Sequence, residues 1–134
     1  MIKNDHVIKI YYRDVDQMGI VYYSRYLEYF EEARTELLVS LGLDVPSIEK
    51  EGVKLPVVTS HCDYKKGARL EEELRIETFI DKTPKATLLI NYKISNNSSG
   101  EINVTGYTKH AFIDNESHPI RVPNFIKDKL AKYF

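Results

Sequence analysis

The chain has a single cysteine, Cys62, among its 134 residues. One cysteine excludes an intrachain disulfide, and no Cys/His spacing resembles a structural zinc site, so we expect a reducing compartment and no bound metal. The first six residues lack the apolar segment of a secretory signal, and no uninterrupted apolar run is long enough to cross a bilayer. These absences predict a cytoplasmic protein without stable membrane insertion.

The chain also lacks an excess of charge of either sign. Nineteen Lys and Arg residues stand against twenty Asp and Glu residues, which gives a formal net charge of -1. No overall basic field therefore favours a nucleic-acid partner or an anionic membrane surface. Hydrophobic residues make up 43% and charged residues 29%, which is typical of a folded globular chain, and the length suits one domain. We expect a single domain that spans residues 1–134.

The first third of the chain predicts one strand and one long helix. The segment Val7–Tyr12 is β-branched and aromatic, which indicates a strand that runs into a polar loop. A helix is expected near residues 23–41, with Ser24 as its N-cap and Gly42 at its end. The apolar residues that recur every three or four positions and should form its buried face are Tyr26, Phe30, Ala33, Leu37 and Leu41.

The remainder of the chain predicts a sheet. Alternation with a period of two indicates four successive strands, at residues 57–64, 74–81, 86–95 and 101–114. Short helices are expected at residues 45–51, ahead of Gly52, and beyond Pro123. The layout is α+β, with one long helix laid on a largely antiparallel sheet and a short C-terminal helix.

Asp14 and Asp16 are the candidate chemical groups, because they precede the start of the long helix. The first turn of a helix carries unpaired backbone N–H groups and a positive partial charge, so it can polarise a carbonyl oxygen beside such a carboxylate. On spacing alone, the two aspartates could instead shape the loop through Asx turns. A calcium-binding EF-hand is a further alternative, but Met18 and Arg25 occupy positions where that loop needs ligands.

A longer motif favours the chemical interpretation. The residues Tyr12-x-Asp14-x-Asp16-x-x-Gly19-x-Val21-Tyr22-x-x-x-Tyr26-Leu27-x-x-Phe30-x-x-Ala33-Arg34 resemble the signature of the 4-hydroxybenzoyl-CoA thioesterase family. The resemblance is greatest to its branch of bacterial acyl-CoA thioesterases associated with the Tol-Pal system, and it extends from about residue 7 to residue 125. It implies the hot-dog fold, in which a five-stranded antiparallel sheet wraps around one long helix.

The resemblance also implies an activity, which is hydrolysis of an acyl-CoA thioester without a cofactor. Carried over by position, the catalytic carboxylate is Asp16, as nucleophile or general base, and the backbone N–H of Tyr23 polarises the thioester carbonyl. Gly19, Val21 and Tyr22 fall at substrate-binding positions, and Asp14 at a structural one. The chain departs from the family pattern at Gln17-Met18 and at Tyr23, where the Tol-Pal-associated branch usually carries His.

The partners follow from the same resemblance. Family members form dimers or tetramers, so a homodimer or homotetramer is expected, and acyl carrier protein is an alternative carrier of the acyl group. A non-catalytic acyl-CoA-binding protein of the same fold is the alternative from another functional class. The candidate residues for binding the phosphates of coenzyme A are Lys65, Lys66, Arg69, Lys82 and Lys85.

Two other groups of residues have simpler interpretations. His61 and Cys62 are neighbours in a predicted strand, so their side chains should point to opposite faces and cannot form a local catalytic pair. His110 shares a strand face with Phe112, which is more typical of an interior or edge histidine whose ring nitrogens are hydrogen-bonded than of a catalytic base.

Overall fold

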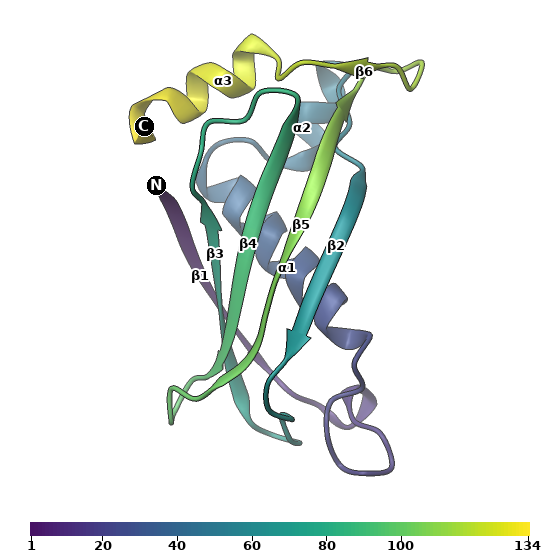
Figure 1. The fold of residues 1–134 in the computed structure, drawn as a ribbon, viewed down its shortest axis with the longest axis vertical. Coiled ribbons are helices and arrows are strands. Elements are labelled where there is room, and N and C mark those ends of the chain that lie inside the picture. The colour runs from purple at the N-terminus through teal and green to yellow at the C-terminus, as the bar shows by residue number, and fades with distance from the viewer.

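A computed structural model describes all 134 residues, and Figure 1 shows one sheet curled around a long helix. The strands of the sheet lie in the order β1-β3-β4-β5-β2, all neighbours are antiparallel, and β6 adds a short pairing to β5. The strands are β1 (Ile2–Lys9), β2 (Val57–Tyr64), β3 (Glu73–Ile80), β4 (Thr87–Asn96), β5 (Ile102–Ile113) and β6 (Pro119–Ile120). The helices are α1 (Arg25–Ser40), α2 (Val45–Lys50) and α3 (Asn124–Leu130), with short 3-10 turns at Tyr12–Asp14 and Ala131–Tyr133. The predicted hot-dog architecture is therefore confirmed.

Helix α1 is held against the sheet by its apolar face. The five residues predicted to form that face are all buried, and Phe30 at its centre stacks on Tyr92 of β4 with ring centroids 4.1 Å apart. Close packing here depends on Gly106 of β5, since a Cβ at this position would lie 2.2 Å from the carbonyl oxygen of His61 and 3.0 Å from the Phe30 ring. The absence of a side chain at Gly106 thus leaves room for the Phe30 ring beneath the middle of α1.

The first strand differs from its prediction. It covers Ile2–Lys9 rather than beginning at Val7, and Tyr12 lies in a 3-10 turn beyond its end. Residues 3–6 are polar, so the apolar pattern did not predict the first half of the strand, although the burial of its residues alternates with a period of two. His6 faces inward in that alternation and its Nε2 lies 2.6 Å from Glu32 on α1, so a polar contact replaces an apolar one.

The ends of the helices agree with the sequence in part. Gly42 and Gly52 adopt left-handed backbone angles, with φ of 71° and 78°, directly after α1 and α2, as helix-ending glycines do. Ser24 occupies the N-cap position of α1, but its side chain makes no capping hydrogen bond. None of the helices combines the length and the apolar character that crossing a membrane requires.

Candidate active site

The loop before α1 folds back on itself at the end of the molecule where α1 begins (Figure 1), and Asp16 is part of this loop. The Asp16 N–H donates to the carbonyl of Ile20 at 2.9 Å, and the Gly19 N–H donates to the carbonyl of Asp16 at 3.0 Å. Gly19 takes a φ of 78°, which a residue without a side chain adopts readily. The tight turn therefore fixes the backbone on both sides of the carboxylate.

The Asp16 side chain is half-buried and has one oxygen to spare. Its Oδ1 accepts a hydrogen bond from the backbone N–H of Met18 at 2.8 Å, which is the Asx turn that the sequence allowed as an alternative. Its Oδ2 has no hydrogen-bond partner or ion pair within the chain. The two interpretations of Asp16 are thus compatible, because the turn orients the carboxylate and leaves one oxygen free.

Helix α1 presents unpaired donors beside this carboxylate. The N–H groups of Arg25, Tyr26 and Leu27 donate to carbonyls of the preceding turn, whereas those of Tyr23 and Ser24 have no acceptor within the chain. Such free donors at the positive end of a helix are suited to bind a carbonyl oxygen or an oxyanion. Asp16 and Tyr23 line the same hollow of about 300 Å³.

Tyrosine rings form one wall of that hollow. Tyr23 lies against Tyr22 with centroids 4.7 Å apart and against Tyr64 at 6.3 Å, and Tyr64 in turn lies 5.7 Å from Tyr26. The neighbouring Tyr23 hydroxyl and, to a smaller extent, the Asp16 charge hold the pKa of Tyr22 above its ordinary value, and burial raises the pKa of Tyr64 to about 12. Both phenols stay protonated at neutral pH, so the wall is aromatic and uncharged.

The buried carboxylate of Asp14 stabilises the loop that carries Asp16. Asp14 accepts a hydrogen bond from the Tyr11 N–H at 2.9 Å, and its Oδ1 lies 3.9 Å from the Arg25 guanidinium. Arg25 also donates to the carbonyl of Arg13 at 3.1 Å, so the first residue of α1 is tied to the loop that carries Asp16. Burial and the Asp14 charge raise the pKa of the nearby Tyr29 phenol far above its usual range. The placement of Asp14 fits its predicted structural role.

The five basic candidates are not brought together in one chain. Lys65 and Lys66 line the hollow with Asp16, although Lys66 also pairs with Glu101 at 2.6 Å. The backbone of Arg69 pairs with that of Ile20, which places it near the loop. Lys82 and Lys85 line a separate depression in the turn between β3 and β4, at the opposite end of the sheet (Figure 1). Strand direction separates the two groups, since β3 carries the chain from one end of the molecule to the other.

His61, Cys62 and His110 lie as the sequence indicated. His61 is exposed and stacks on Tyr107, while Cys62 on the other face is half-buried and packs against the core, and burial raises the pKa of its thiol. His110 is buried and both of its ring nitrogens have partners. No group of three or more His, Cys, Asp or Glu side chains is arranged to hold a metal ion.

Comparison with known proteins identifies the family of the chain. Residues 11–130 match the family described as the thioesterase-like superfamily. The chain belongs to this family. It is 36% identical over 110 residues to YneP, a putative acyl-CoA thioesterase of Bacillus subtilis. The aligned segment covers 82% of this chain and 79% of that protein. It is 35% identical over 92 residues to the acyl-CoA thioesterase YbgC of Haemophilus influenzae, and the aligned segment covers 68% of each of the two chains.

Two solved thioesterase structures share the fold of this chain. A DHNA-CoA thioesterase from Staphylococcus aureus superposes with a TM-score of 0.89 at 30% identity, over 99% of this chain and 89% of that one. A 4-hydroxybenzoyl CoA thioesterase superposes with a TM-score of 0.86 over 96% of this chain and 99% of that one, at 19% identity, which shows the common fold. The family match and the similarity to YbgC confirm the predicted family and its class, a thioester hydrolase.

Proposed function

We propose that this thioesterase hydrolyses acyl-CoA thioesters in the hollow that Asp16 shares with the start of α1. The observation that carries the proposal is the pairing of a carboxylate that has one free oxygen with the unpaired backbone N–H of Tyr23 across one hollow. The relatives named as acyl-CoA thioesterases, YneP and YbgC, support coenzyme A as the leaving group.

The chemistry needs only these two groups and water. The thioester carbonyl oxygen accepts a hydrogen bond from the Tyr23 N–H, and the positive end of α1 stabilises the negative charge that develops on it. Asp16 Oδ2 either attacks the carbonyl carbon, giving a mixed anhydride that water hydrolyses, or takes a proton from the attacking water. The C–S bond breaks in both routes. Since a thiol has a pKa near ~8.5, the thiolate leaves without a dedicated strong acid.

The tyrosine wall and two lysines define how the substrate enters. Tyr22 and Val21 line the hollow with Tyr64, so the acyl end of the thioester meets a surface of aromatic and aliphatic carbon. Lys65 and Lys66 lie on the same rim and offer ammonium groups to the phosphates of coenzyme A. Gly19 contributes through its left-handed turn, which sets the position of Asp16.

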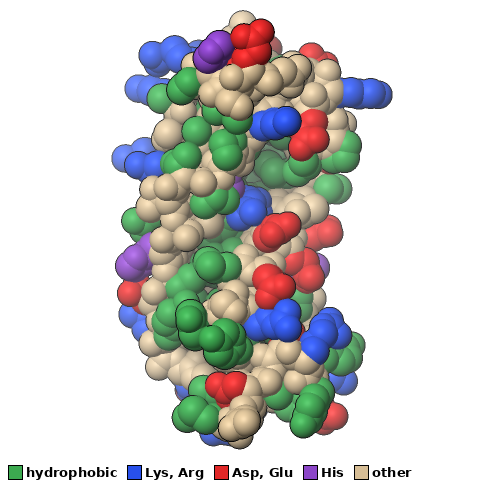
Figure 2. Space-filling model, turned by 90° about the vertical axis from the view of Figure 1, so that its right-hand side faces the viewer, with side chains coloured by type: hydrophobic (Ala, Val, Ile, Leu, Met, Phe, Trp, Pro, Cys, Tyr) green, Lys and Arg blue, Asp and Glu red, His purple; other side chains and the backbone are tan.

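We further propose that the protein is a homodimer, or a tetramer built from such dimers, joined through β2. This strand pairs only with β5, so its outer edge has unsatisfied backbone groups. It is exposed along almost its whole length, including Val57, Val58 and Tyr64, whereas the other edge strand, β1, carries Lys3 and Asp5 outward. The face with this edge gathers hydrophobic side chains from its lower end to its centre (Figure 2).

The experiment is release of free thiol from a panel of acyl-CoA esters by the wild-type protein and by Asp16→Asn. The Asn side chain keeps the Oδ1 that accepts from Met18, so the loop should stay folded while the reactive oxygen is lost. We expect kcat to fall about 100-fold or more. Asp128→Asn, an exposed carboxylate on α3, is the matched control and should retain full activity. Equal rates in Asp16→Asn and wild type would refute the assignment.

The same assay compares carriers of the acyl group. Matched acyl chains on coenzyme A and on acyl carrier protein should show faster turnover of the coenzyme A ester if Lys65 and Lys66 bind its phosphates. Faster turnover of the protein-bound chains would instead identify acyl carrier protein as the partner. Stoichiometric binding of acyl-CoA without turnover would identify a non-catalytic binding protein.

A further inference from the structure

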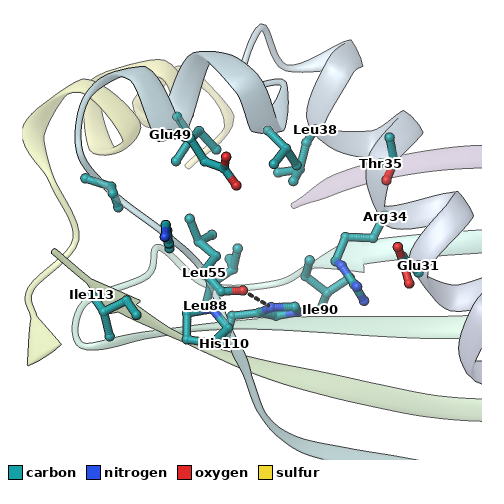
Figure 3. Close-up of a pocket in the computed structure, with 15 residues that line it drawn as sticks. Glu31, Arg34, Thr35, Leu38, Glu49, Leu55, Leu88, Ile90, His110 and Ile113 are labelled. Atoms are coloured by element: carbon teal, nitrogen blue, oxygen red, sulfur yellow. Dashed lines mark hydrogen bonds between the residues drawn. The ribbon is translucent and has the colours of Figure 1, made fainter. Parts of the chain in front are cut away.

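Most buried polar side chains of the protein have hydrogen-bond partners. His110, whose pKa burial lowers to about 4, donates from its Nδ1 to the carbonyl of Leu55 at 3.1 Å (Figure 3). Two buried side-chain atoms lack a partner, and these are the Tyr29 hydroxyl and the Oδ1 of Asn103. The Tyr29 hydroxyl lies close to Asp14, whereas Asn103 lines an open depression. An unpaired acceptor in such a place is a candidate for contact with a ligand.

This depression lies beside the turn between β4 and β5, at the end of the molecule where α1 begins (Figure 1). Its volume is about 470 Å³, and none of its lining residues is hydrophobic. Four carboxylates line it together with a single ammonium group, and these belong to Glu71, Glu72, Glu73, Glu101 and Lys66. The excess of negative charge favours a cationic ligand.

Asn103 forms the floor of the depression, because it is 2% exposed whereas most of the other lining residues are exposed. Its Nδ2 donates to the carbonyl of Lys66 at 3.2 Å, which fixes the orientation of the amide and leaves Oδ1 on the other side without a donor. A carbonyl oxygen accepts hydrogen bonds from N–H or O–H groups. The buried amide therefore suits a ligand that carries N–H groups.

The carboxylates around this floor are only partly used within the chain. Both oxygens of Glu72 accept hydrogen bonds, from the Arg69 N–H at 2.6 Å and from Asn96 at 3.1 Å. The side chains of Glu71 and Glu73 line the depression without a hydrogen bond or an ion pair. No three carboxylates converge as the ligands of a metal ion do, so separate ammonium groups suit this lining better than one metal ion.

We propose that this depression binds an aliphatic polyamine, and that the bound polyamine frees Lys66 to contact the substrate. One ammonium group donates to Asn103 Oδ1, and the others pair with the unused carboxylates of Glu71 and Glu73. A polyamine places its positive charges several bonds apart, which matches carboxylates that do not meet at one point.

Lys66 connects the depression to the Asp16 hollow, because it lines both. Its Nζ lies 2.6 Å from Oε2 of Glu101, which holds the ammonium group on the side of the depression. A ligand ammonium group that pairs with Glu101 weakens this hold, so that Lys66 becomes available to the phosphates of coenzyme A at the rim of the hollow. This link to Lys66 rests on the proposed function, whereas binding of the polyamine does not.

Binding is tested by calorimetric titration of the protein with spermidine at constant ionic strength. We expect saturable binding with a Kd of about 1 mM or tighter, because several ion pairs and one buried hydrogen bond contribute. The double variant Glu71→Gln/Glu73→Gln changes two exposed side chains, so it should fold normally and bind spermidine about fivefold or more weakly. Glu36→Gln/Glu51→Gln removes the same charge from exposed positions outside the depression and should bind as wild type does.

Asn103→Leu tests the buried acceptor. It should weaken the binding of spermidine, and its melting temperature shows whether it folds; if it does not fold, the double glutamate variant decides. Absence of spermidine binding in wild type, or undiminished binding in Glu71→Gln/Glu73→Gln, would overturn the proposal. Equal binding of Mg²⁺ would also overturn it, because charge alone would then attract the ligand. A lysine-rich peptide that binds where spermidine does not would assign the depression to a protein partner instead.

The link to Lys66 is tested by the kinetics of an acyl-CoA ester with and without spermidine. Spermidine should lower the KM of wild type about two- to fivefold and leave kcat unchanged, which is the effect of one additional exposed ion pair. Glu71→Gln/Glu73→Gln, assayed in the same solutions, should show no such fall, and it controls for spermidine that binds the phosphates of the substrate. Glu101→Gln should have the lower KM without spermidine, because Lys66 is already free.

An unchanged KM in wild type saturated with spermidine, or a wild-type KM in Glu101→Gln, would refute the link. Failure of the proposed function is distinguishable from both results, since it would appear as turnover that Asp16→Asn does not reduce. Calorimetric binding of spermidine would stand in that case, because it is measured without substrate.

Discussion

Arg25 is predicted to couple the stability of the loop to the rate of hydrolysis. Its guanidinium is the only cation within 4 Å of the buried Asp14, and it also donates to the carbonyl of Arg13. A hydrogen bond to a charged group contributes about 1.5–3 kcal/mol, and the Arg25 side chain is 34% exposed, so solvent screening reduces this. For Arg25→Gln we expect a loss of about 1–2 kcal/mol in the free energy of unfolding.

This loss has two measurable consequences. The melting temperature should fall by about 3–8 °C for a domain of this size. The value of kcat/KM should fall further than stability explains, by about 10–100-fold, because Asp16 and the Tyr23 N–H lie on the two segments that Arg25 joins, and small misplacements of reacting groups are costly. Assays well below the melting temperature separate the two effects.

Arg25→Lys and Arg121→Gln sharpen the test. A lysine keeps the charge beside Asp14 but lacks the planar fork that reaches Arg13 as well, so it should restore stability more than activity. Arg121 is exposed and makes no hydrogen bond or ion pair, so its replacement should change neither quantity. Wild-type kcat/KM in Arg25→Gln, together with an unchanged melting temperature, would show that the loop does not depend on this contact.

Two further predictions concern the core that supports α1. Gly106→Ala should destabilise the fold by about 2 kcal/mol or more in denaturant unfolding, because the new Cβ meets the His61 carbonyl, and a wild-type midpoint would refute the close approach. His110 should make stability depend on pH. Its folded pKa of about 4 lies below the ordinary 6.5, so the stabilisation is complete above pH 6.5 and is lost as pH falls towards 4, by up to about 3 kcal/mol. His110→Gln should flatten the melting-temperature profile over that window, and an unchanged slope would contradict the assigned burial effect.

The sequence predicted those features that repeat along the chain. The buried face of α1 follows from apolar periodicity, so Phe30 was placed on the right face, and the four strands from Val57 onward were predicted within one residue of their observed bounds. Strand β1 was cut short because Asn4 and His6 point inward and are polar, which breaks the apolar alternation that indicates a strand. Periodicity detects where apolar residues recur, and it misses inward positions that are filled by polar contacts with a helix.

The candidate site was predictable only where neighbours in sequence are neighbours in space. Asp16 and Tyr23 lie on one short segment, so the motif located both. The hydrogen bonds that join Arg34 to Tyr92, Tyr92 to Thr108 and Thr108 to His110 were not predictable. They need the register in which Leu88 lies opposite His110 and the packing of α1 over both strands. The same limit explains why Lys65 and Lys82 were grouped although a full strand separates them.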